Sequence, residues 1–149
     1  MRDAFVVMEE ETAAGHLAGY GVTTWAGLEE EAFTVRELLA LAAEAAGGQH
    51  HLAAIQLPAS LVMMTPIVQA LHGRGPLPAA AGAGLRVMVS APLHGGELPG
   101  MVDQELADLI RPGLTLAQTC VLGWWERRAG RVPLEWRCGG RSCRREGGP

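Results

Sequence analysis

Apolar residues recur at helical spacing in the segment FTVRELLALAAEAAGG, residues 33–48. Thr34 and Glu37 have the T-x-x-E spacing of a capping box, in which the hydroxyl accepts from the third-residue amide and the carboxylate bonds back. The Gly-Gly pair at 47–48 supplies a left-handed stop. The apolar positions that share one face are Leu38, Leu41, Ala42 and Ala45. The pattern therefore predicts an amphipathic helix packed on a core.

Three further segments carry helical patterns with recognisable ends. They are residues 3–16, which stop at Gly15, residues 101–112, which end at Pro112, and residues 115–130, which open with the capping box Thr115-x-x-Gln118 and close at Gly130. Together with the helix at 33–48, the sequence thus predicts four helices.

Short apolar runs bounded by glycine, proline or polar residues predict strands at 16–22, 51–57 and 85–90, with a weaker fourth at 131–136. Val22 precedes Ile55 by 33 residues, and Ile55 precedes Val87 by 32. Strands about thirty residues apart with a helix between them are typical of βαβ units. We therefore expect an α/β fold with a parallel sheet covered on both faces, because its strands are apolar without clear alternation.

Two stretches lack such periodicity. GRGPLPAAAGAG, residues 73–84, has the composition of a low-complexity surface loop. Residues 131–149 form an Arg- and Gly-rich tail that is expected to be largely disordered. The sequence thus predicts one domain over residues 1–130, followed by the tail.

Composition and charge narrow the classes of function. Hydrophobic residues make up 48% of the 149 and charged residues 19%, as in a globular domain. All 12 basic residues are Arg, and Lys and Asn do not occur. Residues 1–125 carry a net charge of −8 (5 Arg, 13 acids) and residues 126–149 one of +4 (7 Arg, 3 acids). The basic tail has no interleaved aromatic ladder, so nucleic acid is not the expected partner.

Targeting signals and cysteines favour a cytoplasmic protein. The first residues turn acidic too early for a secretory signal, and no apolar stretch is long enough to span a membrane. The three cysteines, Cys120, Cys138 and Cys143, are odd in number and scattered, which favours reduced thiols. Their spacing is not that of a zinc site, so no metal is expected.

Four stretches in chain order, GHLAGYGVTTW, AIQLPASL, RVMVSAPLHGG and LTLAQTCVLGWWERRAG, together resemble the C-terminal half of the aldo/keto reductase family. They are similar to its fourth strand, its fifth strand, its sixth strand with the S-x-L-x-x-G segment, and the helix before its seventh strand. The resemblance covers roughly residues 3–130. It implies a partial (β/α)8, TIM-type barrel of about four parallel βα units and a nicotinamide cofactor, NADP.

The resemblance also implies that the catalytic residues are missing. The family transfers hydride with an Asp, a Tyr, a Lys and usually a His from the first half of the barrel. This chain has no Lys, and its one tyrosine, Tyr20, lies on the strand that matches the fourth. We therefore assign no catalytic residue and expect no reductase activity from this chain alone.

Part of the family's cofactor site is retained. Gln56 matches the glutamine that holds the nicotinamide carboxamide, and Thr23 keeps a hydroxyl where the family has Ser followed by Asn. Thr24 replaces that Asn, and Val89 replaces the aromatic ring that stacks on the nicotinamide. No late PG loop for the 2′-phosphate aligns. The residues that match the segment lining the pyrophosphate are Ser90, Leu93 and Gly95.

Each candidate also has a structural interpretation. Gln56 can satisfy a backbone group, and the residues after 90 can form an ordinary βα loop. His94 has no identifiable carboxylate partner, and the histidines at 50–51 read as the solvated start of a strand. The acidic runs at 9–11 and 29–31 read as solvated surface, and Trp124 and Trp125 as core and interface.

Half of a barrel leaves sheet edges and an inner face to be covered. Three alternatives follow for this chain. It forms a dimer with a second copy, it docks a separate N-terminal half-barrel, or it is a truncated product with a frame-shifted tail. Three functions stay open: a remnant nicotinamide site, a non-catalytic interaction or structural subunit that pairs through its sheet edges, and an enzyme of new chemistry using Thr23, Gln56 and His94.

Overall fold

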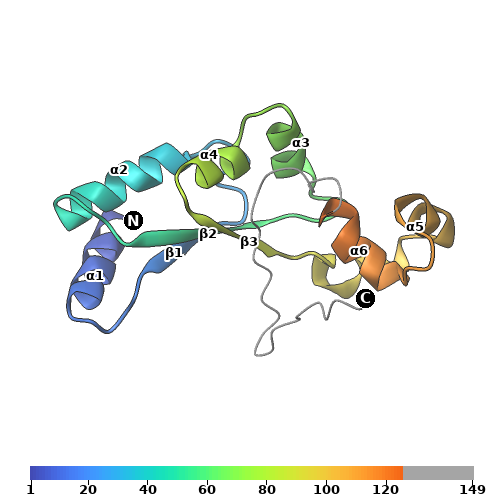
Figure 1. Cartoon of the computed structure of the whole chain (residues 1–149), viewed down its shortest axis with the longest axis horizontal. Coiled ribbons are helices and arrows are strands. Elements are labelled where there is room, and N and C mark those ends of the chain that lie inside the picture. The colour runs from blue at the N-terminus through green and yellow to red at the C-terminus, as the bar shows by residue number, and fades with distance from the viewer. Residues whose placement is uncertain (126–149) are drawn as a thin grey trace, which may run out of the picture.

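A three-stranded parallel sheet organises residues 1–125, the part of the chain that this computed structural model describes (Figure 1). The sheet has the order β1-β2-β3, with β1 at Tyr20–Thr23, β2 at Leu52–Pro58 and β3 at Arg86–Ser90. The strands therefore follow one another in space as they do in sequence. The expected fourth strand at 131–136, the tail at 131–149 and the helix end at Gly130 lie outside the described residues.

The strand spacing in the sequence corresponds to the register of the sheet. Val22 pairs with Ile55, and Ile55 pairs with Val87, so the three residues form one row across the sheet. Ile55 and Val87 are fully buried and Val22 is half-buried. The prediction of an α/β fold with a parallel sheet is thus confirmed. The strands predicted at 16–22, 51–57 and 85–90 are the three that form this sheet.

Three of the predicted helices form within a few residues of their expected bounds, and the fourth begins one residue after its expected start, while its expected end lies outside the described residues. In α2, Thr34 Oγ1 accepts a bond from Glu37 N at 3.2 Å, and Glu37 Oε2 accepts one from Thr34 N at 2.7 Å, which confirms the capping box. Gly47 ends this helix in the left-handed conformation, with φ at 68°. The helix bounds are α1 Arg2–Ala13, α2 Val35–Ala46, α3 Thr65–Leu71, α4 Pro76–Gly82, α5 Gln104–Ile110 and α6 Leu116–Trp125.

The prediction of a surface loop at 73–84 is wrong, because most of this stretch is α4. Pro76 is well suited to a first helical turn, where its missing N–H costs nothing, and the alanines that follow are strong helix formers. Leu77 and Ala80 are buried, the latter completely, and the helix packs against β3. The helix α3 before it was also not predicted. Tertiary burial thus orders a segment whose composition resembles a linker.

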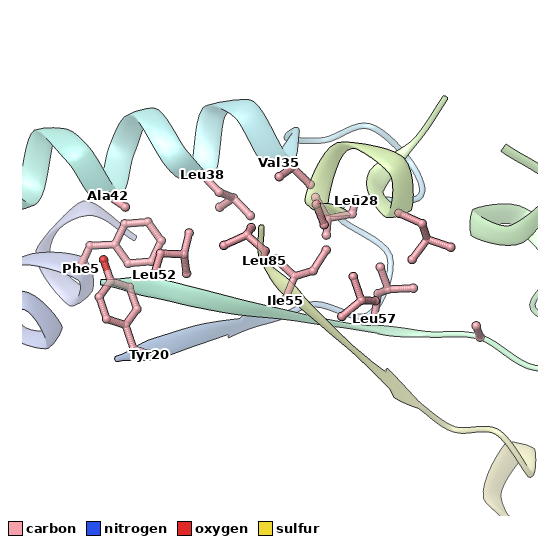
Figure 2. Close-up of a cluster of buried hydrophobic side chains, with 14 of the residues drawn as sticks. Phe5, Tyr20, Leu28, Val35, Leu38, Ala42, Leu52, Ile55, Leu57 and Leu85 are labelled. Carbon is pink, nitrogen blue, oxygen red and sulfur yellow. The ribbon is translucent and has the colours of Figure 1, made fainter. Parts of the chain in front are cut away.

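The main core lies on one side of the sheet. Phe5 of α1, Leu38 and Ala42 of α2, and residues of α3 and α4 pack with Ile55 and Leu57 in one cluster (Figure 2). In Figure 1, α2, α3 and α4 lie on the same side of the strands. The expectation that both faces are covered is wrong for the described residues, because most side chains on the opposite face are exposed or half-buried, Pro58 being the buried exception.

We call that opposite surface the open face. Side chains alternate across a strand, so the rows on either side of the buried row from Val22 to Val87 point away from the core. Its members, in cross-strand order, are Gly21, Ala54 and Arg86 in one row, Thr23, Gln56 and Met88 in the next, and Pro58 and Ser90 in the last.

Candidate functional site

Thr23 and Gln56 are direct neighbours on the open face. They pair across β1 and β2 at the carboxyl end of β1, and Gln56 pairs in turn with Met88 of β3. Neighbouring strands lie about 5 Å apart, so the hydroxyl and the amide can reach one planar group. Thr23 is exposed and Gln56 half-buried. Five residues were assigned to a cofactor from the sequence, and among them Thr23 and Gln56 are direct cross-strand partners.

Ser90 lies on the same face, one row beyond. It ends β3 opposite Pro58, and its carbonyl accepts from Ala59 N at 3.1 Å. The open face therefore presents a hydroxyl, an amide and a second hydroxyl along the carboxyl ends of three parallel strands. Ligands of open parallel sheets bind beyond these ends.

The loop after β3 is held in an unusual backbone conformation. Ala91 and His94 both have positive φ, at 54° and 48°, which side-chain-bearing residues seldom adopt. His94 is half-buried rather than exposed, and its Nδ1 is a buried atom without a hydrogen-bond partner. Such strain persists where the surroundings over-determine the backbone. Here Leu98 supplies part of that constraint because it is buried in a second apolar cluster.

The structure places Leu93 and Gly95 differently from each other. Leu93 packs against the second cluster, which contains Leu98, Val102 and Cys120, so it anchors the loop to α6. Gly95 is exposed with φ at 71° and has nothing within 4 Å of its Cβ position, so backbone there is accessible. Burial raises the pKa of the Cys120 thiol, which argues against a reactive cysteine at this loop.

Trp25 is a candidate that the sequence analysis did not assign. Its side chain is 60% exposed and lies two residues beyond Thr23, at the carboxyl end of β1. An indole in that place can stack on a flat ring. The sequence feature that could have indicated Trp25 is its position two residues after the end of this strand. Thr24, by contrast, has a local role, because its Oγ1 accepts from Gly27 N at 2.9 Å.

The chemistry of this face fits a carboxamide but holds no acid or base for hydride transfer. A nicotinamide amide needs both a donor and an acceptor, and the Gln56 amide offers both beside the Thr23 hydroxyl. Tyr20 cannot serve as the acid, because it begins β1, at the opposite end of the strands.

Tyr20 instead belongs to a buried polar cluster at the amino ends of the strands. Its hydroxyl donates to Glu9 Oε1 at 2.6 Å, and His51 N donates to the same oxygen at 2.9 Å. Glu9 Oε2 lies 2.7 Å from His51 Nδ1. Glu9 is 7% exposed, so the expectation that residues 9–11 are all solvated is wrong for Glu9. The carboxylate ties α1 to the first residues of β1 and the residue before β2.

Two opposing effects act on the Glu9 carboxyl. Burial raises its pKa, but the hydrogen bonds from His51 and Tyr20 outweigh burial and leave the pKa below the ordinary value. Burial and the adjacent carboxylate raise the pKa of Tyr20 far above its usual range. The phenol therefore stays protonated as a donor, which is a structural role.

A metal-ligand cluster and a membrane-spanning helix are both absent from residues 1–125. No group of three or more His, Cys, Asp or Glu side chains is arranged to hold a metal ion in this range. Among the helices described here, none is both long and apolar enough to cross a membrane.

Comparison with known proteins assigns no family to this chain. No protein-family model matches it, and neither a curated protein nor a solved structure is detectably similar.

Proposed function

We propose that this chain is a non-catalytic half of a (β/α)8 oxidoreductase-like barrel, similar to the aldo/keto reductases, which binds NADP at the carboxyl end of its sheet. The observation that carries the proposal is the cross-strand pair Thr23 and Gln56 on the open face. In the proposed complex, this pair holds the nicotinamide carboxamide and Trp25 stacks on the ring. Ser90 and the backbone at Gly95 lie toward the pyrophosphate, while Leu93 positions the loop.

Two observations support the proposed lack of reductase activity. The chain has no Lys, and its one tyrosine is engaged by Glu9 at 2.6 Å within a buried cluster. A positioned general acid contributes roughly 10²–10⁴ in rate. The nicotinamide, when bound, would supply a hydride, and the described residues would bind and orient it without moving a proton to a substrate.

Titration with NADPH, followed by cofactor fluorescence, tests the proposal. Wild type should bind with micromolar affinity, and Gln56→Ala should bind about tenfold more weakly because two hydrogen bonds of the carboxamide are lost. Trp25→Ala should weaken binding by a similar factor through loss of stacking.

The matched control is Gln104→Ala, since Gln104 is an exposed glutamine on α5, where its side chain donates to Asp108 of the same helix. This variant should bind like wild type. No binding at millimolar NADPH, or equal affinity of Gln56→Ala and wild type, would overturn the proposal.

A second candidate is a structural subunit formed by two copies of this chain. Within residues 1–125, β1 and β3 each have one side without a neighbouring strand, and Met88 on the open face is 41% exposed. Unpaired strand edges and exposed apolar side chains favour association.

Light scattering tests this candidate through the molar mass, which is 15.7 kDa for one chain. A dimer should have twice this mass and should dissociate in Met88→Asp. Met101→Asp, at a methionine that is 72% exposed outside the sheet, should leave the mass unchanged. A monomer at all concentrations, or equal dissociation of both variants, would exclude pairing through the open face.

A further inference from the structure

Two helices on opposite sides of the sheet belong to segments of opposite net charge. Residues 1–44, which include α1, contain nine acidic residues and two arginines, and their net charge is −7. Residues 45–96, which include α3, contain two arginines and no acidic residue, and their net charge is +2. In Figure 1, α1 lies beside the amino ends of the strands and α3 beyond their carboxyl ends. Charge therefore favours a contact between α1 of one molecule and α3 of another.

The outward side of α1 carries exposed apolar residues among its acids. Phe5 and Glu9 are the buried residues of this helix. Val7 and Met8 point away from them, because successive helical residues are turned by about 100°, and they are 49% and 37% exposed. We call this side the α1 surface. Its members, all exposed, are Asp3, Val7, Met8, Glu10 and Glu11.

A second exposed apolar surface lies on α3. Ile67 packs into the main core, whereas Val68 and Leu71 are 43% and 64% exposed. Residues three apart lie on one side of a helix, so these two side chains are neighbours. Arg74 follows the helix and is exposed. We call Val68, Leu71 and Arg74 the α3 surface.

The apolar residues of both surfaces favour association, and the charges decide which surfaces meet. Two α1 surfaces would bring the carboxylates of Asp3, Glu10 and Glu11 together, which is repulsive. The α3 surface instead offers the Arg74 guanidinium, in a segment without carboxylates. Contact between unlike surfaces is therefore favoured. Since the two surfaces lie on opposite sides of the sheet, such a contact leaves one free surface at each end of the assembly.

We propose that this chain associates head to tail, with the α1 surface of one copy on the α3 surface of the next. The exposed apolar residues of the two surfaces contact one another, and Arg74 lies among the carboxylates of α1. This contact uses neither the open face nor any residue assigned to the cofactor. It therefore does not depend on NADP binding.

Sedimentation equilibrium of the full chain tests this proposal. The mass of wild type should rise with concentration beyond two copies of 15.7 kDa, because each added copy leaves a free surface. Small interfaces are weak, so the Kd should be on the order of 100 μM. Salt at about 0.5 M should weaken the association several-fold, because it screens exposed charges.

Two variants, each with one surface disrupted, make the test specific. Val7→Asp and Leu71→Asp should each be monomeric alone. Their equimolar mixture should form a complex of two copies and no more, because each variant retains the surface that the other lacks. Leu109→Asp, at a residue that is 78% exposed on α5, should associate like wild type. Circular dichroism checks that each variant keeps the helix content of wild type.

Three results would overturn the proposal. They are a wild type that stays monomeric at millimolar concentration, undiminished self-association of Val7→Asp or Leu71→Asp, and a mixture of these variants that stays monomeric. A dimer that dissociates in Met88→Asp and not in Leu71→Asp would overturn it in favour of the open face. Gln56→Ala should associate like wild type, so failure of the cofactor site and failure of this interface are separately visible.

Discussion

Replacing Glu9 by alanine should lower the free energy of unfolding by about 1–3 kcal/mol. The Glu9 carboxylate is 7% exposed and accepts from Tyr20, from His51 N and from the His51 ring at 2.6–2.9 Å. Without it, the Tyr20 hydroxyl and the His51 backbone N–H lose their acceptor in a region with little water. Since whole domains are stable by about 5–15 kcal/mol, this loss is large.

Urea unfolding of Glu9→Ala and wild type at pH 7 measures the effect. Glu10→Ala is the control, because Glu10 is an exposed glutamate on the same helix, and it should change stability by less than about 0.5 kcal/mol. Similar losses in both variants would show that the buried cluster does not stabilise the fold.

The contribution of Glu9 should also depend on pH. Its pKa is lowered in the folded protein, so this contribution is complete above the ordinary pKa of a glutamate and is lost as the pH falls through the lowered folded value. The stability of wild type should therefore fall more steeply in acid than that of Glu9→Gln. Parallel pH profiles of the two proteins would contradict this assignment.

Ile55→Ala should destabilise the protein by about 2–5 kcal/mol. Ile55 is fully buried at the centre of the sheet, between Val22 and Val87, and packs beneath the helices of the main core (Figure 2). Its truncation removes apolar contacts and leaves a cavity that rigid neighbours on three sides cannot fill.

Leu109→Ala is the matched control for this prediction, because Leu109 is 78% exposed on α5. It should change the free energy of unfolding by less than about 0.5 kcal/mol. Denaturant midpoints and slopes for the two variants make the comparison. A loss below about 1 kcal/mol in Ile55→Ala would mean that the central row is not the main contact of sheet and helices.

Several elements could be predicted because their signals are local. The T-x-x-E and T-x-x-Q pairs at Thr34 and Thr115 form the expected hydrogen bonds at 2.7–3.2 Å. These bonds connect residues three apart, so neighbouring chemistry decides them. The spacing of Val22, Ile55 and Val87 also predicted βαβ units and a parallel sheet. In the structure the three residues pair in one row across that sheet.

Other elements could not be predicted because their causes are distant in sequence. The helix α4 is ordered by the burial of Leu77 and Ala80 against β3, which its Gly- and Pro-rich composition does not reveal. Glu9 resembles its acidic neighbours, and only the approach of residue 51, which is 42 positions away, makes it a buried acceptor. The left-handed conformation of His94 is likewise imposed by the surrounding packing.

For the candidate site, the sequence by itself indicated three strands of a parallel sheet, and its resemblance to a known family selected Thr23, Gln56 and Ser90 as candidate residues. Only the tertiary structure decided that they lie on a face that residues 1–125 leave largely open, that Leu93 packs against a second cluster, and that Trp25 is exposed at the end of β1. The physical reason is that the presence and spacing of strands follow from local periodicity, whereas burial depends on which distant segments pack on each face.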